Sequence, residues 1–145
     1  MAIRTSSAVW HGTLKDGNGT LTVGDGKWEA PYSFASRFEE GEGTNPEELI
    51  GAAQAGCYSQ AFSLELEKAG YTPDSIRTTA VVHLDKAGEG FKITRVDLSV
   101  SGEVPGIGED TFKDIARQAK VSCPVSQALA GAEITLKAEL PVPTP

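Results

Sequence analysis

The pattern of apolar and polar residues divides the chain into a strand-rich first third, one long helix and a mixed second half. In the first third, apolar and β-branched residues alternate with polar ones in short runs between glycine-rich turns, which is typical of antiparallel strands. The strands predicted by this alternation are residues 8–14, 20–23 and 27–34. The last is interrupted near Pro31, because proline cannot donate a ladder hydrogen bond. A polar stretch rich in Glu and Gly follows at residues 37–44.

The strongest helix signal begins at Asn45, a residue that caps helices, followed by Pro46 at the first helical position. Glu47 and Glu48 complement the positive end of the helix dipole, and Glu48 has the spacing from Asn45 of a capping box. We expect this helix to continue until the residue before Gly70.

Small residues fill the middle of the predicted helix, from Gly51 through Gly56 to Cys57. A glycine inside a helix costs roughly 1 kcal/mol relative to alanine. The two glycines therefore indicate that another backbone or a ligand approaches closely near Cys57. The alternative is ordinary tight packing of a helix in a core.

The second half combines strands with helices, so the fold class is predicted to be α+β. The predicted strands are residues 76–84, 91–100 and 132–140, and the predicted helices are residues 109–120 and 122–130. The tail from Pro141 to Pro145 holds three prolines and is expected to be frayed. We find no repeat and no linker, and predict a single domain over residues 1–145.

Charge and composition narrow the classes of function. The chain has a net charge of −7, which argues against binding to nucleic acid and to anionic membrane surfaces. Residues 1–7 contain no apolar segment of a signal peptide, and no apolar stretch is long enough to cross a bilayer. We therefore expect a cytoplasmic protein, in which cysteines stay reduced and are more often catalytic or redox-active than structural.

The chain has two cysteines, Cys57 and Cys123, and two-step thiol chemistry needs one sulfur that reacts and one that resolves. If Pro124 begins a helix, Cys123 is its N-cap, where free N–H groups favour the thiolate. Cys57 lies in mid-helix and needs a cation to become reactive; Arg37, oriented by Glu47 or Glu48, is a candidate. The alternatives are inert buried cysteines and solvated surface charges.

Spacing limits how these residues meet. Glu47 and Cys57 are ten residues apart, and this separation is about 15 Å of rise on a straight helix. Glu47 therefore acts through Arg37, or the helix is broken early, or a second subunit brings Glu47 in. His11 and His83 have no Cys, Asp or Glu at ligand spacing, and the sequence holds no C-x-x-C motif and no phosphate loop. We expect neither a metal nor a cofactor.

Two motifs resemble the osmotically inducible protein C (OsmC) family. The first runs from Tyr32 through Arg37 and the Asn-Pro-Glu sequence at residues 45–47 to Cys57, and the second is the Ser-Cys-Pro-Val-Ser sequence at residues 122–126. The resemblance extends from about Ala8 to Leu140 and favours the OsmC branch over the organic-hydroperoxide-resistance branch.

This resemblance implies an intertwined α+β homodimer with N-terminal antiparallel strands, a long central helix carrying Cys57, a second strand set with C-terminal helices, and sites at the subunit interface. It implies a cysteine-based peroxidase that reduces organic hydroperoxides without a metal or flavin. Cys57 is then the peroxidatic thiolate and Cys123 the resolving thiol, joined in a disulfide during the cycle. Arg37 stabilises the thiolate and Glu47 holds Arg37. An external dithiol or a lipoylated protein is the reductant.

Aromatic residues near Cys57 are predicted to favour alkyl or lipid hydroperoxides over hydrogen peroxide by forming an apolar wall; they are Phe38, Tyr58 and Phe62. Two other functions stay open. One is a thiol-based redox sensor or binding protein with little turnover. The other is a structural dimer with two inert cysteines.

Overall fold

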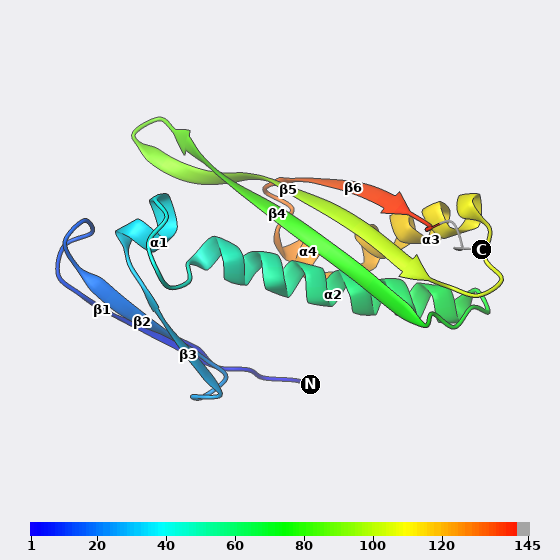
Figure 1. Ribbon diagram of the computed structural model, residues 1–145, viewed down its shortest axis with the longest axis horizontal. Helices are drawn as coiled ribbons and strands as arrows, with labels where there is room; N and C mark the ends of the chain where they lie inside the picture. Colours follow the sequence, from blue (N-terminus) through cyan, green and yellow to red (C-terminus); the bar gives the residue numbers. More distant parts are fainter. Residues whose placement is uncertain (142–145) are drawn as a thin grey trace. The chain divides into compact units, whose positions relative to one another are not determined.

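The computed structural model describes residues 1–141 and has the predicted α+β architecture, with two three-stranded sheets and one long helix (Figure 1). Residues 142–145, which make up most of the tail predicted to be frayed, lie outside the described residues. The chain forms two compact units, residues 1–49 and residues 50–145.

The first unit contains an antiparallel meander of β1 (Ser6–His11), β2 (Asn18–Val23) and β3 (Trp28–Tyr32). The strand predicted at residues 8–14 ends at His11, because Gly12 adopts a positive φ of 93° and begins the turn. Trp10 and Tyr32 pack with their ring centroids 5.2 Å apart. Gly19 lies between them, where an added Cβ would stand 2.6 Å from the Tyr32 ring.

The prediction that the third strand continues to Phe34 is wrong, because Ser33 caps a short helix, α1 (Phe34–Phe38). The Ser33 hydroxyl accepts a hydrogen bond from the Ser36 amide at 3.1 Å, and the Ser36 hydroxyl accepts one from the Ser33 amide at 2.8 Å. Serine therefore fills the place that Glu or Gln usually takes in a capping box. This substitution explains why the sequence pattern did not reveal α1.

The predicted long helix is confirmed as α2 (Pro46–Lys68). The Asn45 side-chain oxygen accepts a hydrogen bond from the Glu48 amide at 2.8 Å, and Gly70 follows the helix with a φ of 90°. The helix has no break between its ends. Of the three ways for Glu47 to take part in chemistry at Cys57, an early break is therefore ruled out.

The second unit contains a hairpin of β4 (Ser75–Ala87) and β5 (Gly90–Glu103), with β6 (Glu133–Glu139) parallel to β5. Two helices, α3 (Glu109–Ser122) and α4 (Pro124–Ala128), connect β5 to β6. Figure 1 shows α2 running along one face of this sheet. All three predicted strands and both predicted helices are present, with changed ends.

The core of the second unit is formed by apolar side chains of α2, β5 and α3; its largest members are Tyr58, Phe62, Leu66, Leu98 and Phe112. The Tyr58 hydroxyl is satisfied inside this core by donating to the Ala116 carbonyl at 2.8 Å. Tyr58 and Phe62 are both fully buried, with 0% of their surface exposed. The prediction that they form a substrate-facing wall is therefore wrong, and they belong to the core.

The two helix glycines have different surroundings. A Cβ at Gly51 would lie 3.4 Å from the Val82 side chain and 3.5 Å from the Ala80 carbonyl oxygen, so Gly51 allows close packing of α2 on β4. A Cβ at Gly56 would meet no atom within 4 Å. Tight core packing therefore explains Gly51, and Gly56 leaves an open surface on α2.

The first unit lacks an apolar core of its own among the described residues. Its buried side chains are polar, namely Ser36, Thr44, Asn45 and Glu47. Its large apolar side chains include Val9, Leu14 and Trp28, which are 56%, 57% and 45% exposed. A three-stranded sheet needs an apolar face packed on another surface to be stable. This sheet therefore depends on cover from elsewhere.

Candidate active site

The fold brings Cys57 and Cys123 together from α2 and from the junction of α3 and α4. Cys123 is the N-cap of α4 and Pro124 is the first helical residue, as predicted. Both thiols are free, Cys57 half-buried and Cys123 fully buried. The two side chains lie close enough for each to shift the pKa of the other thiol, and such proximity is what two-step thiol chemistry needs.

The surroundings of the two sulfurs differ in their effect on charge. Burial raises the pKa of the Cys123 thiol, but contacts with the Ser126 hydroxyl and amide, the Cys57 thiol and the Val125 amide outweigh burial and lower it below 9.0. The Cys123 sulfur accepts no N-cap hydrogen bond from the first amides of α4. Burial raises the pKa of Cys57 despite a contact from the Val125 amide, and Cys123 raises it further. Within the second unit, negative charge is therefore better stabilised on Cys123.

A buried polar chain continues from Cys123 to Gln54. Ser126 is 6% exposed and its hydroxyl oxygen accepts a hydrogen bond from Gln54 Nε2 at 2.6 Å. Gln54 is 0% exposed, and its Oε1 has no hydrogen-bond partner among the described residues. The sequence analysis gave Gln54 no role and named Ser126 only as the last residue of the motif at residues 122–126. The available signal was a large polar side chain, Gln54, within a run of Gly and Ala.

Arg37 and Glu47 form a two-pronged ion pair in the first unit. Arg37 Nη2 donates to Glu47 Oε1 at 2.6 Å, and Arg37 Nε lies 3.2 Å from each carboxylate oxygen. The Glu47 side chain is 10% exposed and that of Arg37 is 34% exposed. Glu48 instead accepts a hydrogen bond from the Thr44 hydroxyl at 3.0 Å. Of the two carboxylates considered for orienting Arg37, Glu47 is the one that binds it.

Arg37 also lies on the wall of a pocket of about 270 Å³ in the first unit. Its other lining residues are mostly aromatic or apolar, namely Trp10, Leu14, Tyr32, Ser33, Phe34 and Phe38. The Arg37 guanidinium carbon lies 5.3 Å from the centre of the Phe38 ring. An apolar pocket with one fixed cation suits a small apolar ligand that carries a polar end. Phe38 lines this pocket in the first unit, so its predicted place in a wall beside Cys57 stays a prediction.

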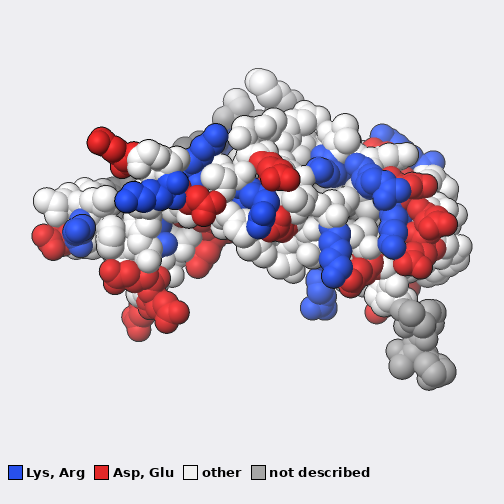
Figure 2. Space-filling model, turned by 90° about the horizontal axis from the view of Figure 1, so that it is seen from above, with Lys and Arg blue, Asp and Glu red and all other residues white. Residues whose placement is uncertain are grey.

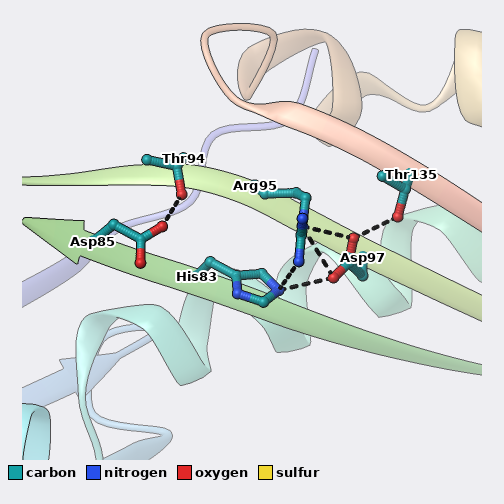
Figure 3. Close-up of polar contacts among 6 residues, drawn as sticks. All are labelled: His83, Asp85, Thr94, Arg95, Asp97 and Thr135. Carbon is teal, nitrogen blue, oxygen red and sulfur yellow. Dashed lines mark hydrogen bonds and ion pairs between the residues drawn. The ribbon is translucent and has the colours of Figure 1, made fainter.

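A second polar cluster lies on the sheet of the second unit (Figure 3). Asp97 accepts hydrogen bonds from His83 Nε2 at 2.8 Å, from Thr135 at 2.5 Å and from Arg95 Nε at 3.2 Å. Nearby, Thr94 donates to Asp85. The sequence pattern did not link His83 with an acid, because the two residues lie on neighbouring strands. In the described residues, no three His, Cys, Asp or Glu side chains gather as metal ligands would.

The Asp97 cluster predicts a pH dependence of stability. Hydrogen bonds from Thr135 and His83, together with the charge of Arg95, hold the pKa of Asp97 below 3.8. A carboxylate with a lowered pKa in the folded state stabilises the fold above its unfolded pKa, near 4, and this contribution is lost as the pH falls further. In urea unfolding at several pH values, Asp97→Asn should be less stable than wild type at neutral pH and lose less stability below pH 4.

The matched control for Asp97→Asn is Asp85→Asn, which removes the carboxylate that binds Thr94 on the same sheet. It should keep the wild-type loss of stability at low pH. If Asp97→Asn shows the same loss below pH 4 as wild type, Asp97 does not cause the pH dependence.

The charges on one face of the molecule are mixed in sign. Figure 2 shows acidic and basic side chains intermixed over the visible face, without the continuous basic surface that phosphate backbones require. Among the described residues, no helix has the length and apolar character to cross a bilayer.

Comparison with known proteins identifies the family. The model of the OsmC-like protein family matches residues 39–139. The chain is 51% identical over 138 residues to peroxiredoxin OsmC of Escherichia coli, covering 94% of this chain and 96% of that protein. It is 33% identical over 97 residues to the organic hydroperoxide resistance protein OhrA of Bacillus subtilis, covering 65% of this chain and 66% of that protein.

Solved structures agree with this match. A crystal structure of an organic hydroperoxide resistance protein OsmC from Legionella pneumophila superposes with a TM-score of 0.74 at 25% identity, covering 98% of this chain and all (100%) of that one. The higher identity to peroxiredoxin OsmC than to OhrA agrees with the predicted branch. On the fold, the two motifs and these similarities, the chain belongs to the OsmC-like protein family.

Proposed function

We propose that this protein is a cysteine-based peroxidase that reduces organic hydroperoxides to alcohols. The observation that carries the proposal is the proximity of Cys57 and Cys123, the only two cysteines of the chain, which pack in the same cluster and affect each other's pKa. The 51% identity to peroxiredoxin OsmC supports the same activity. In this proposal, residues 1–145 form one functional domain. The protein is located in the cytoplasm, where dithiols are kept reduced.

The reaction begins when the Cys57 thiolate attacks the terminal oxygen of ROOH. The O–O bond breaks, the alkoxide takes a proton and leaves as the alcohol, and Cys57 becomes a sulfenic acid. The Cys123 sulfur then attacks the Cys57 sulfur and hydroxide leaves, which gives a disulfide and, after protonation, water. A dithiol or a lipoylated protein restores both thiols by exchange. No metal or bound cofactor takes part.

Arg37 is the cation that Cys57 needs. Because the surroundings of Cys57 in its own unit raise the pKa of its thiol, the thiolate requires stabilisation from outside that unit. A guanidinium supplies positive charge and N–H donors for the peroxide oxygens. Glu47 holds the guanidinium fork through three short contacts of 2.6 to 3.2 Å. The aromatic pocket beside Arg37 receives the apolar part of the hydroperoxide.

The working form is an intertwined homodimer. Two exposed surfaces support it: the sheet of the first unit, whose apolar side chains have no core, and the side of α2 at Gly56 and Leu64. Leu64 is 50% exposed, and Gly56 permits close approach of a second helix. A second copy of the chain covers both surfaces and places sites at the interface.

A thiol-based redox sensor with little turnover is the second candidate. The raised pKa of Cys57 favours it, because a thiol that is mostly protonated at neutral pH reacts slowly with peroxide. The disulfide would then form without rapid recycling.

Turnover distinguishes the two functions. Wild-type protein is mixed with cumene hydroperoxide and dihydrolipoamide, and hydroperoxide consumption is followed under multiple-turnover conditions, with hydrogen peroxide in parallel. We expect many turnovers and a higher kcat/KM for cumene hydroperoxide. Consumption that stops after one equivalent with every dithiol favours the sensor, and no consumption contradicts both functions. Sedimentation of the same sample measures whether it is a dimer.

A further inference from the structure

We infer that Gln54 and Ser126 are positioning residues that hold a hydrogen-bond donor on the Cys123 sulfur. They thereby make Cys123 the sulfur that carries negative charge when the disulfide forms and when it is reduced. This inference rests on the proposed peroxidase function. It adds which sulfur attacks when the disulfide forms and which sulfur leaves when the disulfide is reduced.

The direction of the hydrogen bonds follows from the groups involved. Gln54 Nε2 is a hydrogen-bond donor and cannot accept, so at 2.6 Å it donates to the hydroxyl oxygen of Ser126. The Ser126 hydroxyl has one hydrogen of its own, and this hydrogen remains free to point elsewhere. Ser126 is the third residue of α4, the helix that Cys123 caps. Its hydroxyl and amide lower the pKa of the Cys123 thiol, which places their dipoles toward that sulfur. Gln54 thus leaves Ser126 as a donor toward Cys123.

The opposite orientation of the amide is less favourable. Its Oε1 would accept the Ser126 hydrogen, and Ser126 would then accept from the Cys123 S–H and stabilise the neutral thiol. Both hydrogens of the Gln54 nitrogen would also be buried without that partner. The observed orientation leaves one unpartnered atom, the Gln54 oxygen, in a side chain that is 0% exposed. Retaining a buried glutamine with an unused acceptor is costly, and a role for its donor explains why it is there.

Burial strengthens the effect of this chain. Gln54 and Cys123 are both 0% exposed and Ser126 is 6% exposed, so little water competes for the Ser126 hydrogen. A hydrogen bond to a charged sulfur is stronger in such surroundings than in water. Ser126 therefore favours the Cys123 thiolate more than the Cys123 thiol.

The first consequence is that the disulfide forms faster. The Cys123 thiolate attacks the sulfur of the Cys57 sulfenic acid, the S–S bond forms, the S–O bond breaks, and the leaving hydroxide takes up a proton. The thiolate is the attacking form, so its population sets the rate of this step.

The consequence for reduction is a preferred point of attack. A thiolate of the external dithiol attacks Cys57, the S–S bond breaks, and the electron pair stays on Cys123, where Ser126 stabilises it. The better-stabilised thiolate is the better leaving group. The exposures agree with this direction, because Cys57 is half-buried and Cys123 is fully buried. The mixed disulfide with the reductant therefore forms on Cys57.

The test measures the titration of Cys123 directly. In a Cys57→Ser background, the ultraviolet absorbance of the thiolate is followed against pH. Ser126→Ala should raise the midpoint by about one pH unit, which is a tenfold loss of thiolate below the midpoint. Gln54→Glu should raise it at least as much, because a carboxylate accepts the Ser126 hydrogen and adds negative charge. Ser126→Thr keeps the hydroxyl and should restore the midpoint.

The matched control is Ser59→Ala on α2, which removes a half-buried hydroxyl that binds Ala55 and Thr78. It should not move the midpoint. The inference is overturned if Ser126→Ala and Gln54→Glu titrate like the parent, or if Ser59→Ala shifts the midpoint equally. The titration needs no hydroperoxide, so its outcome is separate from that of the proposed function. A protein that turns over but shows no shift overturns only the inference.

A kinetic measurement extends the test to the enzyme with both cysteines. After one equivalent of cumene hydroperoxide, Ser126→Ala should slow disulfide formation about tenfold more than sulfenic acid formation at neutral pH. Equal slowing of both steps would indicate a general structural defect and contradict a specific role at Cys123.

Discussion

Cys57→Ser is expected to abolish turnover of organic hydroperoxides, lowering the rate roughly a thousandfold or more, as loss of the nucleophile does in other enzymes with a covalent intermediate. Serine has nearly the same shape, but its hydroxyl stays protonated at neutral pH and does not attack the O–O bond. Cys57 is half-buried and packs at the edge of the core, so the change should leave the fold intact. Hydroperoxide consumption and far-ultraviolet circular dichroism, measured on the same sample, check both points.

Cys123→Ser separates the two thiols. This variant should consume one equivalent of hydroperoxide and stall with a sulfenic acid on Cys57, seen by mass spectrometry as one added oxygen and trapped by a dimedone reagent. Ser59→Ala serves as the control on α2 and should turn over normally. Full activity of Cys57→Ser, or a sulfenic acid on Cys123 in the wild type, would contradict the assignment and exchange the two roles.

Local signals explain which parts of the fold were predictable. The capping residues Asn45 and Glu48, together with Gly70, fix the two ends of α2 through contacts within a few residues. The short helix α1 escaped prediction because its cap uses two serines, Ser33 and Ser36, which the usual capping pattern does not include. Short-range sequence patterns therefore predict an element well only when its ends follow the common residue preferences.

The candidate site divides in the same way. The N-cap position of Cys123 follows from the proline after it, and the structure has it as predicted. The contacts of Gln54 with Ser126, and of His83 with Asp97, join segments far apart in the chain, and no local spacing indicates them. Buried aromatic residues near a cysteine also mislead, since Tyr58 and Phe62 belong to the core.

The proposed mechanism gives the two cysteines and the ion pair complementary tasks. Cys123 has its charge stabilised by contacts within the second unit, whereas Cys57 has its pKa raised there. The first unit in turn contains a cation, Arg37, that is held firmly by Glu47 but is still 34% exposed at its side chain. In the proposed mechanism Cys57 reacts first, and its thiolate needs a cation from outside the second unit. This dependence makes Arg37 the most informative residue after the cysteines.

Arg37→Met is expected to lower kcat/KM for cumene hydroperoxide by about 10- to 1,000-fold at neutral pH, because an adjacent cation lowers a thiol pKa by about 1 to 3 units. The direction of the pH effect follows from the charge. Without the guanidinium the pKa of Cys57 rises, so the loss is largest at low pH and shrinks as the pH increases and the thiolate forms. Rates measured from pH 5 to 10 should give a profile displaced to higher pH. A wild-type profile with a uniformly lower rate would show that Arg37 does not act on the thiolate.

The partner carboxylate allows a finer distinction between charge and orientation. Glu47→Gln keeps the size of the side chain and leaves the cation in place, but it weakens the two-pronged grip on the guanidinium. We expect a loss of about tenfold, with a smaller displacement of the pH profile than in Arg37→Met. Glu48→Gln, next in the chain and bound to Thr44, is the matched control and should behave like wild type. If Glu47→Gln and Glu48→Gln lower the rate equally, the ion pair with Arg37 has no specific role. If only Glu47→Gln lowers it, the orientation of Arg37 contributes to catalysis in addition to its charge.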